Sequence, residues 1–180
     1  MYDFGHRAFD MATFMQTGAH ALRALIPRVT VRNAIMDATP TLPLKILVVE
    51  DNPVDVDLIR WVLTAHELPH YLHVIDNADH AMHYVDDLAQ HDRHLSPTLM
   101  LLDLTLPQRD GRELLQRVKS LPEGADMQVV IVTGSHNPAD RRETLAMGAD
   151  AYFVKPSHLN EFMQLGNLIK DLAFDHPKER

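Results

Sequence analysis

One carboxylate interrupts the most apolar part of the chain. The stretch LMLLDLTLPQRDGRELL, residues 99 to 115, passes through four apolar residues to Asp103 before a turn that contains Pro107 and Gly111. A buried, ionised carboxylate costs several kcal/mol unless a partner compensates its charge. Asp103 is therefore expected to be capped, bound to a metal ion or used chemically.

Other polar residues follow apolar runs in the same way. Glu50 and Asp51 follow KILVV, Thr133 ends QVVIVT, and Lys155 follows AYFV. In open parallel sheets, ligands bind beyond the carboxyl ends of the strands. We therefore expect five side chains to meet at one edge of such a sheet: the carboxylates of Glu50, Asp51 and Asp103, the hydroxyl of Thr133 and the amine of Lys155.

This set of residue types suits phosphoryl chemistry. Neighbouring carboxylates repel one another unless a cation neutralises them, and an all-oxygen group of this kind suits Mg²⁺. The metal ion and Lys155 would together neutralise the charge of an incoming phosphate. An aspartate can attack phosphorus to form an aspartyl phosphate, and the rest of the catalysis is positioning and charge stabilisation. Asp103 is thus a candidate nucleophile.

The elements that must position these residues alternate along the chain. Strands are predicted at 45–50, 71–75, 98–102, 128–133 and 151–154, and helices at 54–66, 78–89, 112–120, 140–147 and 158–174. Apolar runs without in/out alternation are typical of parallel strands buried on both faces. The pattern predicts an α/β fold, a flavodoxin-like doubly wound parallel sheet of five βα units. The strand order of flavodoxin-like folds is 2-1-3-4-5, and with this order the first and third strands are neighbours, so that Glu50 and Asp51 adjoin Asp103.

The predicted helices carry apolar stripes that should cover the sheet. In the helix at 54–66 the stripe consists of Val54, Leu58, Trp61, Val62 and Ala65. A stripe of this spacing indicates one buried helix face.

Composition bounds the class of protein. The 180 residues are 46% hydrophobic and 23% charged, which is typical of one globular domain with a short appendage. The net charge of −8 argues against binding to nucleic acid or to an anionic membrane. The absence of cysteine excludes disulfides and thiolate chemistry and is compatible with a cytoplasmic location. No apolar run approaches the roughly 18 residues of a membrane span.

Residues 1–43 differ from the rest. They are predicted to form an N-terminal extension with an amphipathic helix and a linker, DATPTLP. The apolar side of that helix would consist of Met11, Ala12, Phe14, Met15, Ala19, Leu22, Leu25 and Ile26. An alternative is that the native product starts at Met36.

From Leu44 to about Phe174 the chain resembles a response regulator receiver domain, so residues 44–180 are assigned to that domain. The stretches ILVVEDNP, LLDLTLPQRDG, IVTG and YFVKP carry the resemblance, and Asp103 precedes Thr133 by 30 positions and Lys155 by 52. The stretches VEDNPVDVDLIR and LDLTLPQRDGRELL are most similar to single-domain regulators that pair with phytochrome-type kinases.

The resemblance implies roles for the acidic residues. Asp103 would accept a phosphoryl group from a histidine kinase. The ligands of Mg²⁺ would be Glu50, Asp51, Asp103 and the backbone carbonyl of Thr105. The single-domain regulators that pair with phytochrome-type kinases usually have asparagine where this chain has Thr105, which leaves the rate of dephosphorylation open.

The resemblance also implies a switch. Thr133 and Lys155 would contact the phosphoryl group, and Tyr152 would be an aromatic switch that turns inward. The Lys155–Pro156 peptide bond would be cis.

The last predicted helix carries two apolar stripes. One would face the sheet: Leu159, Phe162, Met163, Ile169 and Ala173. The other, Leu165, Leu168 and Leu172, would lie on the opposite side and indicates a partner helix. We predict a homodimer through the fourth helix, fifth strand and fifth helix; the alternative is that the N-terminal helix covers these leucines.

The function expected from all this is a two-component signalling switch, a phosphoacceptor and not an enzyme with a separate substrate. Six residues follow Phe174, so no DNA-binding output domain is expected and output would be by protein contact. A phosphatase of the haloacid dehalogenase kind is an alternative, but its second aspartate would stand where Thr105 is. A nucleotide-binding sheet would need a glycine-rich phosphate loop, which is missing. An unphosphorylated binding module is a further alternative.

Overall fold

The computed structural model describes residues 42–90 and 96–175. All of them belong to one compact unit, Pro40–Arg180. The predicted extension at 1–43, with its amphipathic helix, lies almost wholly outside the described residues and stays a prediction. Within the described residues, no helix is long and apolar enough to cross a membrane.

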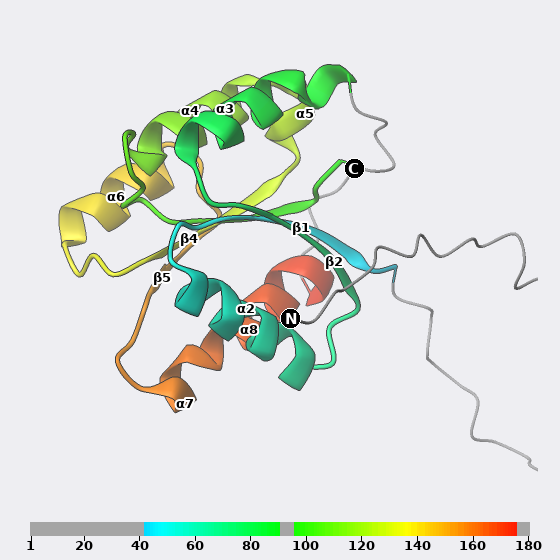
Figure 1. Ribbon diagram of the computed structural model, residues 1–180, viewed down its shortest axis with the longest axis vertical. Coiled ribbons are helices and arrows are strands. Elements are labelled where there is room, and N and C mark those ends of the chain that lie inside the picture. Colours follow the sequence, from blue (N-terminus) through cyan, green and yellow to red (C-terminus); the bar gives the residue numbers. More distant parts are fainter. Residues whose placement is uncertain (1–41, 91–95, 176–180) are drawn as a thin grey trace, which may run out of the picture. The chain divides into compact units, whose positions relative to one another are not determined.

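A five-stranded parallel sheet forms the centre of this unit (Figure 1). Its strands are β1 (Leu44–Val49), β2 (His70–Ile75), β3 (Leu99–Leu102), β4 (Gln128–Thr133) and β5 (Ala151–Val154). They lie in the order β2-β1-β3-β4-β5, and every neighbouring pair is parallel. The predicted fold class and strand order are confirmed.

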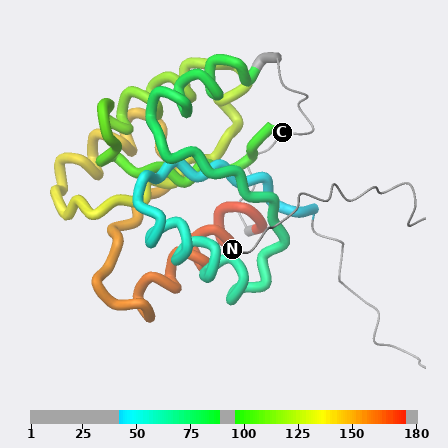
Figure 2. The backbone as a smooth tube through the Cα atoms, in the orientation of Figure 1, coloured from blue at the N-terminus to red at the C-terminus, as the bar shows by residue number. Residues whose placement is uncertain are grey.

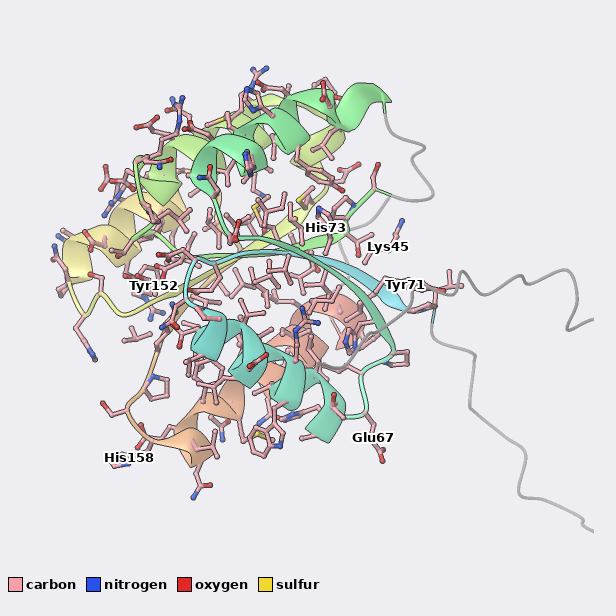
Figure 3. All side chains as sticks on the ribbon, in the orientation of Figure 1. Lys45, Glu67, Tyr71, His73, Tyr152 and His158 are labelled. Carbon is pink, nitrogen blue, oxygen red and sulfur yellow. The ribbon has the colours of Figure 1, made fainter. Side chains whose placement is uncertain are left out.

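Burial follows the position of each strand in the sheet. All four residues of β3 are buried, because β1 and β4 flank this strand and helices cover both of its faces. The edge strand β2 has a neighbour on one side only, and its residues alternate in exposure. Tyr71 of β2 is 69% exposed. Figure 3 shows Tyr71 and Lys45 at one end of the sheet and Tyr152 at the other.

Helices lie on both faces of the sheet (Figures 1 and 2). One face is covered by α3 (Ala78–Asp86), α4 (Gly111–Ser120), α5 (Pro122–Ala125) and α6 (Pro138–Ala146). The other is covered by α2 (Pro53–Ala65), α7 (Leu159–Phe162) and α8 (Gln164–Lys170). A 3-10 turn at Asp87–Gln90 follows α3, and a π-helical turn at Asp171–Asp175 follows α8. The sheet therefore separates two apolar cores.

Local sequence signals start the helices that follow the strands. The side chains of Asn52, Asn77, Asp110 and Asn137 each accept a hydrogen bond from the first turn of the helix that follows. Proline occupies the first turn of α2 and α6, where a missing N–H costs nothing. These caps fix where each helix leaves the carboxyl edge of the sheet.

The predicted stripe on α2 is confirmed only in part: Val62 is buried and Leu58 packs against the core, but Val54, Trp61 and Ala65 are exposed. Val54 is 63% exposed and Trp61 is 45% exposed. The buried face consists of Val56, Ile59, Val62 and Leu63. Both sets have helical spacing, so periodicity alone could not select the rotation of the helix; packing on the sheet decided it.

The predicted stripes of the last helix are confirmed only in part. Phe162 and Ile169 are buried, and Met163 and Ala173 pack against the same core, as expected of the stripe that faces the sheet. Leu165 is fully buried in the core, and Leu168 and Leu172 are partly buried against the same core. Leu159, expected to face the sheet, is 49% exposed. The prediction assumed one uninterrupted helix, but α7 ends at Phe162, α8 begins at Gln164 and a π-helical turn follows. Leu165 follows Phe162 by three residues and precedes Ile169 by four, so helical spacing places it on the same buried face, and these leucines form no exposed stripe. The homodimer itself stays a prediction.

Candidate functional site

The strand register brings the predicted polar residues to one edge of the sheet. Val49 pairs with Leu102 at the ends of β1 and β3, so Glu50 and Asp103 are the next residues on neighbouring strands. The Asp103 N–H donates to the Val49 carbonyl at 3.0 Å, which extends the ladder to the carboxylate itself.

Lys155 reaches the same edge from β5. Thr133 pairs with Val154 at the ends of β4 and β5, and the Lys155 N–H donates to the Thr133 carbonyl at 2.8 Å. The long side chain then crosses to the carboxylates of the central strands. Its Nζ lies 2.7 Å from Glu50 Oε2 and 2.7 Å from Asp103 Oδ2. The prediction that these three residues meet is therefore confirmed.

A third carboxylate, missed by the sequence analysis, joins this cluster. Asp55 Oδ2 lies 2.8 Å from Lys155 Nζ. Asp55 stands in the first turn of α2, where an acidic side chain is favoured by the helix dipole and by the free N–H groups. Because this preference alone explains an acidic residue at position 55, the sequence did not indicate its contact with Lys155. The available signal was its position four residues after the acidic pair Glu50–Asp51, on a helix that starts at the same edge of the sheet.

Water is largely excluded from the cluster. The exposed fractions of the side chains are 2% for Glu50, 8% for Asp103, 14% for Lys155 and 19% for Asp55. In such surroundings an ion pair is stronger than at the surface, and an unpaired charge is more costly.

Burial and pairing shift the pKa values in this cluster. Burial raises the pKa of Glu50, and the nearby Lys155 ammonium opposes that rise without cancelling it. Burial alone would lower the pKa of Lys155, but its hydrogen bonds to Asp103, Asp55 and Glu50 outweigh that effect and raise it. Lys155 is therefore a permanent cation at this edge.

The loop after β3 holds Asp103 closely. Asp103 Oδ1 accepts a hydrogen bond from the Thr105 N–H at 2.9 Å. Gly111 donates its N–H to the Leu104 carbonyl, and a Cβ at this position would lie 2.3 Å from the Asp103 carbonyl oxygen. Only glycine fits such a close approach, so the first residue of α4 fixes the backbone next to the Asp103 carboxylate.

Thr133 and Tyr152 meet at Ser135, which the sequence analysis did not single out. The Thr133 side chain is fully buried, and its hydroxyl oxygen accepts from the Ser135 N–H at 3.3 Å. The Tyr152 hydroxyl donates to the Ser135 carbonyl at 3.0 Å, and Tyr152 is 8% exposed. Tyr152 thus occupies an inward position. The hydrogen bonds among the described residues do not link Thr133 to Asp103.

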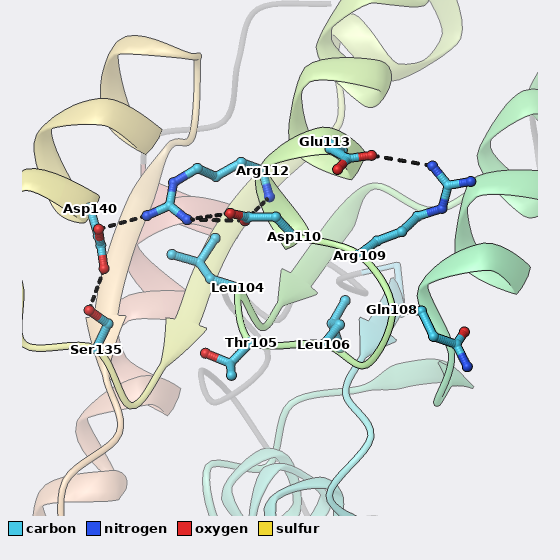
Figure 4. A pocket seen from close by; sticks show the side chains of 10 residues that line it. All are labelled: Leu104, Thr105, Leu106, Gln108, Arg109, Asp110, Arg112, Glu113, Ser135 and Asp140. Atoms are coloured by element: carbon cyan, nitrogen blue, oxygen red, sulfur yellow. Dashed lines mark hydrogen bonds and ion pairs between the residues drawn. The ribbon is translucent and has the colours of Figure 1, made fainter.

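A polar groove lies beside this switch region. Its lining includes the loop after β3 and the start of α6 (Figure 4). Arg112 of α4 spans the groove and pairs with Asp110, with Asp140 at 2.7 Å and with Glu143 at 3.1 Å. Asp140 also accepts a hydrogen bond from the Ser135 hydroxyl. Arg112 of α4 and Ser135 therefore contact the same carboxylate, that of Asp140, which connects α4 to the segment after β4.

The oxygen donors at this edge suit Mg²⁺ in chemical type. Glu50 and Asp103 are close enough to contact the same cation, the Lys155 ammonium. All four predicted ligands would bind Mg²⁺ through an oxygen atom of a carboxylate or a backbone carbonyl. Asp51 is exposed, and the hydrogen bonds of the described part of the chain do not connect it to the cluster. Among residues 42–90 and 96–175, no three acidic or histidine side chains are gathered as a metal-binding group.

The expectation of a cis bond before Pro156 is wrong. No cis peptide bond occurs in the described residues, so Lys155–Pro156 is trans. The trans form is the one that X–Pro bonds favour intrinsically, by about 0.5–1 kcal/mol.

Comparison with known proteins points to one family. The family model of the response regulator receiver domain matches residues 46–166. Response regulator Rcp1 of Synechocystis sp. (strain ATCC 27184 / PCC 6803 / Kazusa) is 32% identical over 123 residues, which are 68% of this chain and 84% of Rcp1. The transcriptional regulatory protein PhoP of Escherichia coli (strain K12) is 32% identical over 124 residues, and this chain spans about half of its length, 49%.

Solved structures agree with this finding. The phosphorylated cyanobacterial phytochrome response regulator RcpA matches with a TM-score of 0.64 and 32% identity, over 72% of this chain and 93% of RcpA. The Mn(2+)-bound form of Rcp1 matches with a TM-score of 0.65 and 30% identity, over 74% of this chain and 96% of Rcp1. Fold, site geometry and sequence thus lead to the same conclusion: the chain belongs to the response regulator receiver domain family.

Proposed function

We propose that this chain is a two-component response regulator that accepts a phosphoryl group on Asp103 from a histidine kinase. One observation carries the proposal: a permanent cation, Lys155, lies 2.7 Å from the Asp103 carboxylate, at an edge it shares with Glu50. An anionic phosphoryl group arriving at Asp103 would meet a positive charge already in place, so transition-state charge is stabilised without rearrangement.

The reaction transfers the phosphoryl group between two residues. An Asp103 carboxylate oxygen attacks phosphorus and forms a P–O bond, while the P–N bond to the kinase histidine breaks and the imidazole keeps the electron pair. Lys155 neutralises the phosphoryl oxygens. Thr133, at the end of β4, would contact the same oxygens and draw the segment of Ser135 with it, since Ser135 donates its N–H to the Thr133 hydroxyl oxygen.

Mg²⁺, held by Glu50, Asp51, Asp103 and the Thr105 carbonyl, would supply further positive charge for the phosphoryl oxygens. The Mn(2+)-bound form of Rcp1 supports a divalent cation in this role. The resemblance to RcpA, a phytochrome response regulator, supports a phytochrome-type kinase as the partner. We also propose that the chain acts in the cytoplasm.

Output would be by protein contact at the face formed by α6, β5 and α8. Tyr152 of β5 and Ser135 before α6 are joined by a hydrogen bond, so a shift at Ser135 reaches this face directly. The same face is where we propose the homodimer to form. Leu145 of α6, 38% exposed, would be part of the contact in place of the buried leucines of α8.

Intact mass spectrometry tests the proposal. The protein is incubated with acetyl phosphate and Mg²⁺, beside Asp103→Asn, an EDTA sample and the control Asp126→Asn, which changes an exposed aspartate after α5. One phosphoryl adduct on the wild type and on Asp126→Asn only, dependent on the metal ion, is the expected result. No adduct on the wild type, together with no binding of beryllofluoride, would refute the proposal, because the second measurement excludes rapid hydrolysis.

A further inference from the structure

The three N–H donors of Lys155 are all engaged by carboxylates. An ammonium group has three donors and no acceptor, and here they are directed at Glu50, Asp55 and Asp103 at 2.7, 2.8 and 2.7 Å. The three acceptors come from three places in the fold: the end of β1, the first turn of α2 and the end of β3. Lys155 is thus positioned by three independent elements.

Two of these three carboxylates, Asp103 and Glu50, have a second role in the proposed function. Asp103 becomes the acyl phosphate, so its oxygen next to Lys155 loses most of its negative charge. Glu50 is a proposed ligand of Mg²⁺, which carries twice the charge of an ammonium and competes with it for the carboxylate. Asp55 has neither role, and its contact with Lys155 is the one that phosphorylation leaves in place.

Asp55 is itself held in position. The Asn52 side-chain amide donates to Asp55 Oδ2 at 3.2 Å, the same oxygen that contacts Lys155. The helix that carries Asp55 packs on the sheet through Ile59, one turn further along, which is buried in the core with residues of the strands. The carboxylate is therefore attached to a rigid element and does not depend on a flexible loop.

We propose that Asp55 is a positioning residue that keeps the Lys155 ammonium over the phosphoryl site while Glu50 and Asp103 are engaged elsewhere. This inference rests on the proposed function. Asp55 acts only through Lys155 and touches no reacting atom. Its loss would let the flexible lysine side chain leave the site in the occupied state, where the ammonium is needed.

The first test is the rate of phosphorylation by acetyl phosphate at saturating Mg²⁺. Asp55→Asn should slow it by about three- to tenfold, the effect expected for losing one charge-assisted hydrogen bond that orients the cation. The matched control is Asp57→Asn, which removes the same charge from the exposed side of the same helix and should leave the rate within about twofold. An unchanged rate in Asp55→Asn would overturn the inference, because it would show that Asp55 does not help to position Lys155. A faster rate would also overturn it, because it would show that the Asp55 carboxylate mainly repels the anionic donor.

A second test needs neither metal ion nor phosphoryl group. Unfolding free energies in EDTA are measured for the wild type, Asp55→Asn, Lys155→Gln and the double variant. The two changes should be non-additive, with Asp55→Asn less harmful once Lys155 is absent, whereas the cycle with Asp57→Asn should be additive. Additivity in both cycles would overturn the inference. If the wild type takes up no phosphoryl group, the proposed function fails; if it does and the Asp55 variant behaves as the wild type, only this inference fails.

Discussion

Replacing Lys155 with methionine removes the cation from the centre of the acidic cluster while keeping an unbranched side chain of similar length. Three carboxylates that now share one ammonium at 2.7–2.8 Å would then face one another. In EDTA no other cation replaces the ammonium. The variant should therefore be less stable than the wild type.

The expected loss follows from how deeply the cluster is buried. Removing one member of a buried ion pair costs about 3–5 kcal/mol, whereas an exposed pair contributes about 0–1 kcal/mol. Glu50 and Asp103 are 2% and 8% exposed, but Asp55 and Lys155 are 19% and 14% exposed, so the cluster lies between these limits and nearer the first. We expect Lys155→Met to lower the free energy of unfolding by about 2–4 kcal/mol in EDTA.

Urea denaturation followed by circular dichroism measures this loss, in EDTA and again with Mg²⁺. A ligand at about 100 times its Kd stabilises the folded state by about 2.7 kcal/mol. The variant should gain more from Mg²⁺ than the wild type does, because Lys155 no longer competes for Glu50 and Asp103. The control is Lys170→Met on α8, which removes the same charge outside the cluster.

Two results would refute this reasoning. A loss below about 1 kcal/mol in EDTA would show that solvent screens the carboxylates as it does at the surface. An equal gain from Mg²⁺ in wild type and variant would show that metal ion and ammonium do not compete for the same oxygens.

Three further predictions concern the same edge of the sheet. Burial raises the pKa of Glu50, so the folded state binds the Glu50 proton more tightly than the unfolded chain does. The free energy of unfolding of the wild type should therefore fall as the pH rises through the folded-state pKa of Glu50. Glu50→Gln should therefore become more favourable relative to the wild type as the pH in EDTA rises from the unfolded-state pKa, about 4, through the raised folded-state pKa. A pH-independent difference in urea denaturation would contradict this. Tyr152→Phe removes the hydrogen bond to Ser135 and should cost about 1 kcal/mol in the same assay, and an unchanged midpoint would show that the bond does not persist in solution. Gly111→Ala forces a Cβ against the Asp103 carbonyl oxygen and should lower stability by about 1–3 kcal/mol and slow phosphorylation; a normal melting temperature would mean that the loop relaxes without cost.

Much of the fold could be predicted because its signals are local. Short apolar runs without alternation indicate buried parallel strands, and their alternation with helical segments determines a doubly wound sheet. The carboxyl ends of such strands lie at one edge, so Glu50, Asp103 and Lys155 could be brought together from their order alone. The strand order was expected because it is that of flavodoxin-like folds, and the structure confirms it.

One error arose where a local signal allowed two answers. Helical spacing on α2 fits the stripe of Val54 and Trp61 as well as the stripe of Val56 and Ile59, and only contact with the sheet distinguishes them. The error at the C-terminal end was different: Leu165 was assigned to the wrong side, although it lies three residues after Phe162 and four before Ile169 and therefore shares their face.

The sequence by itself thus determined which elements form and which residues follow them, because these depend on the order of apolar and polar residues along the chain. The tertiary structure alone decided the rotation of α2 and the partners of the charged groups. The triple contact of Lys155 with Glu50, Asp55 and Asp103 joins residues up to 105 positions apart. Its formation depends on how α2 and β5 converge at the carboxyl edge, and that is a property of packing in three dimensions.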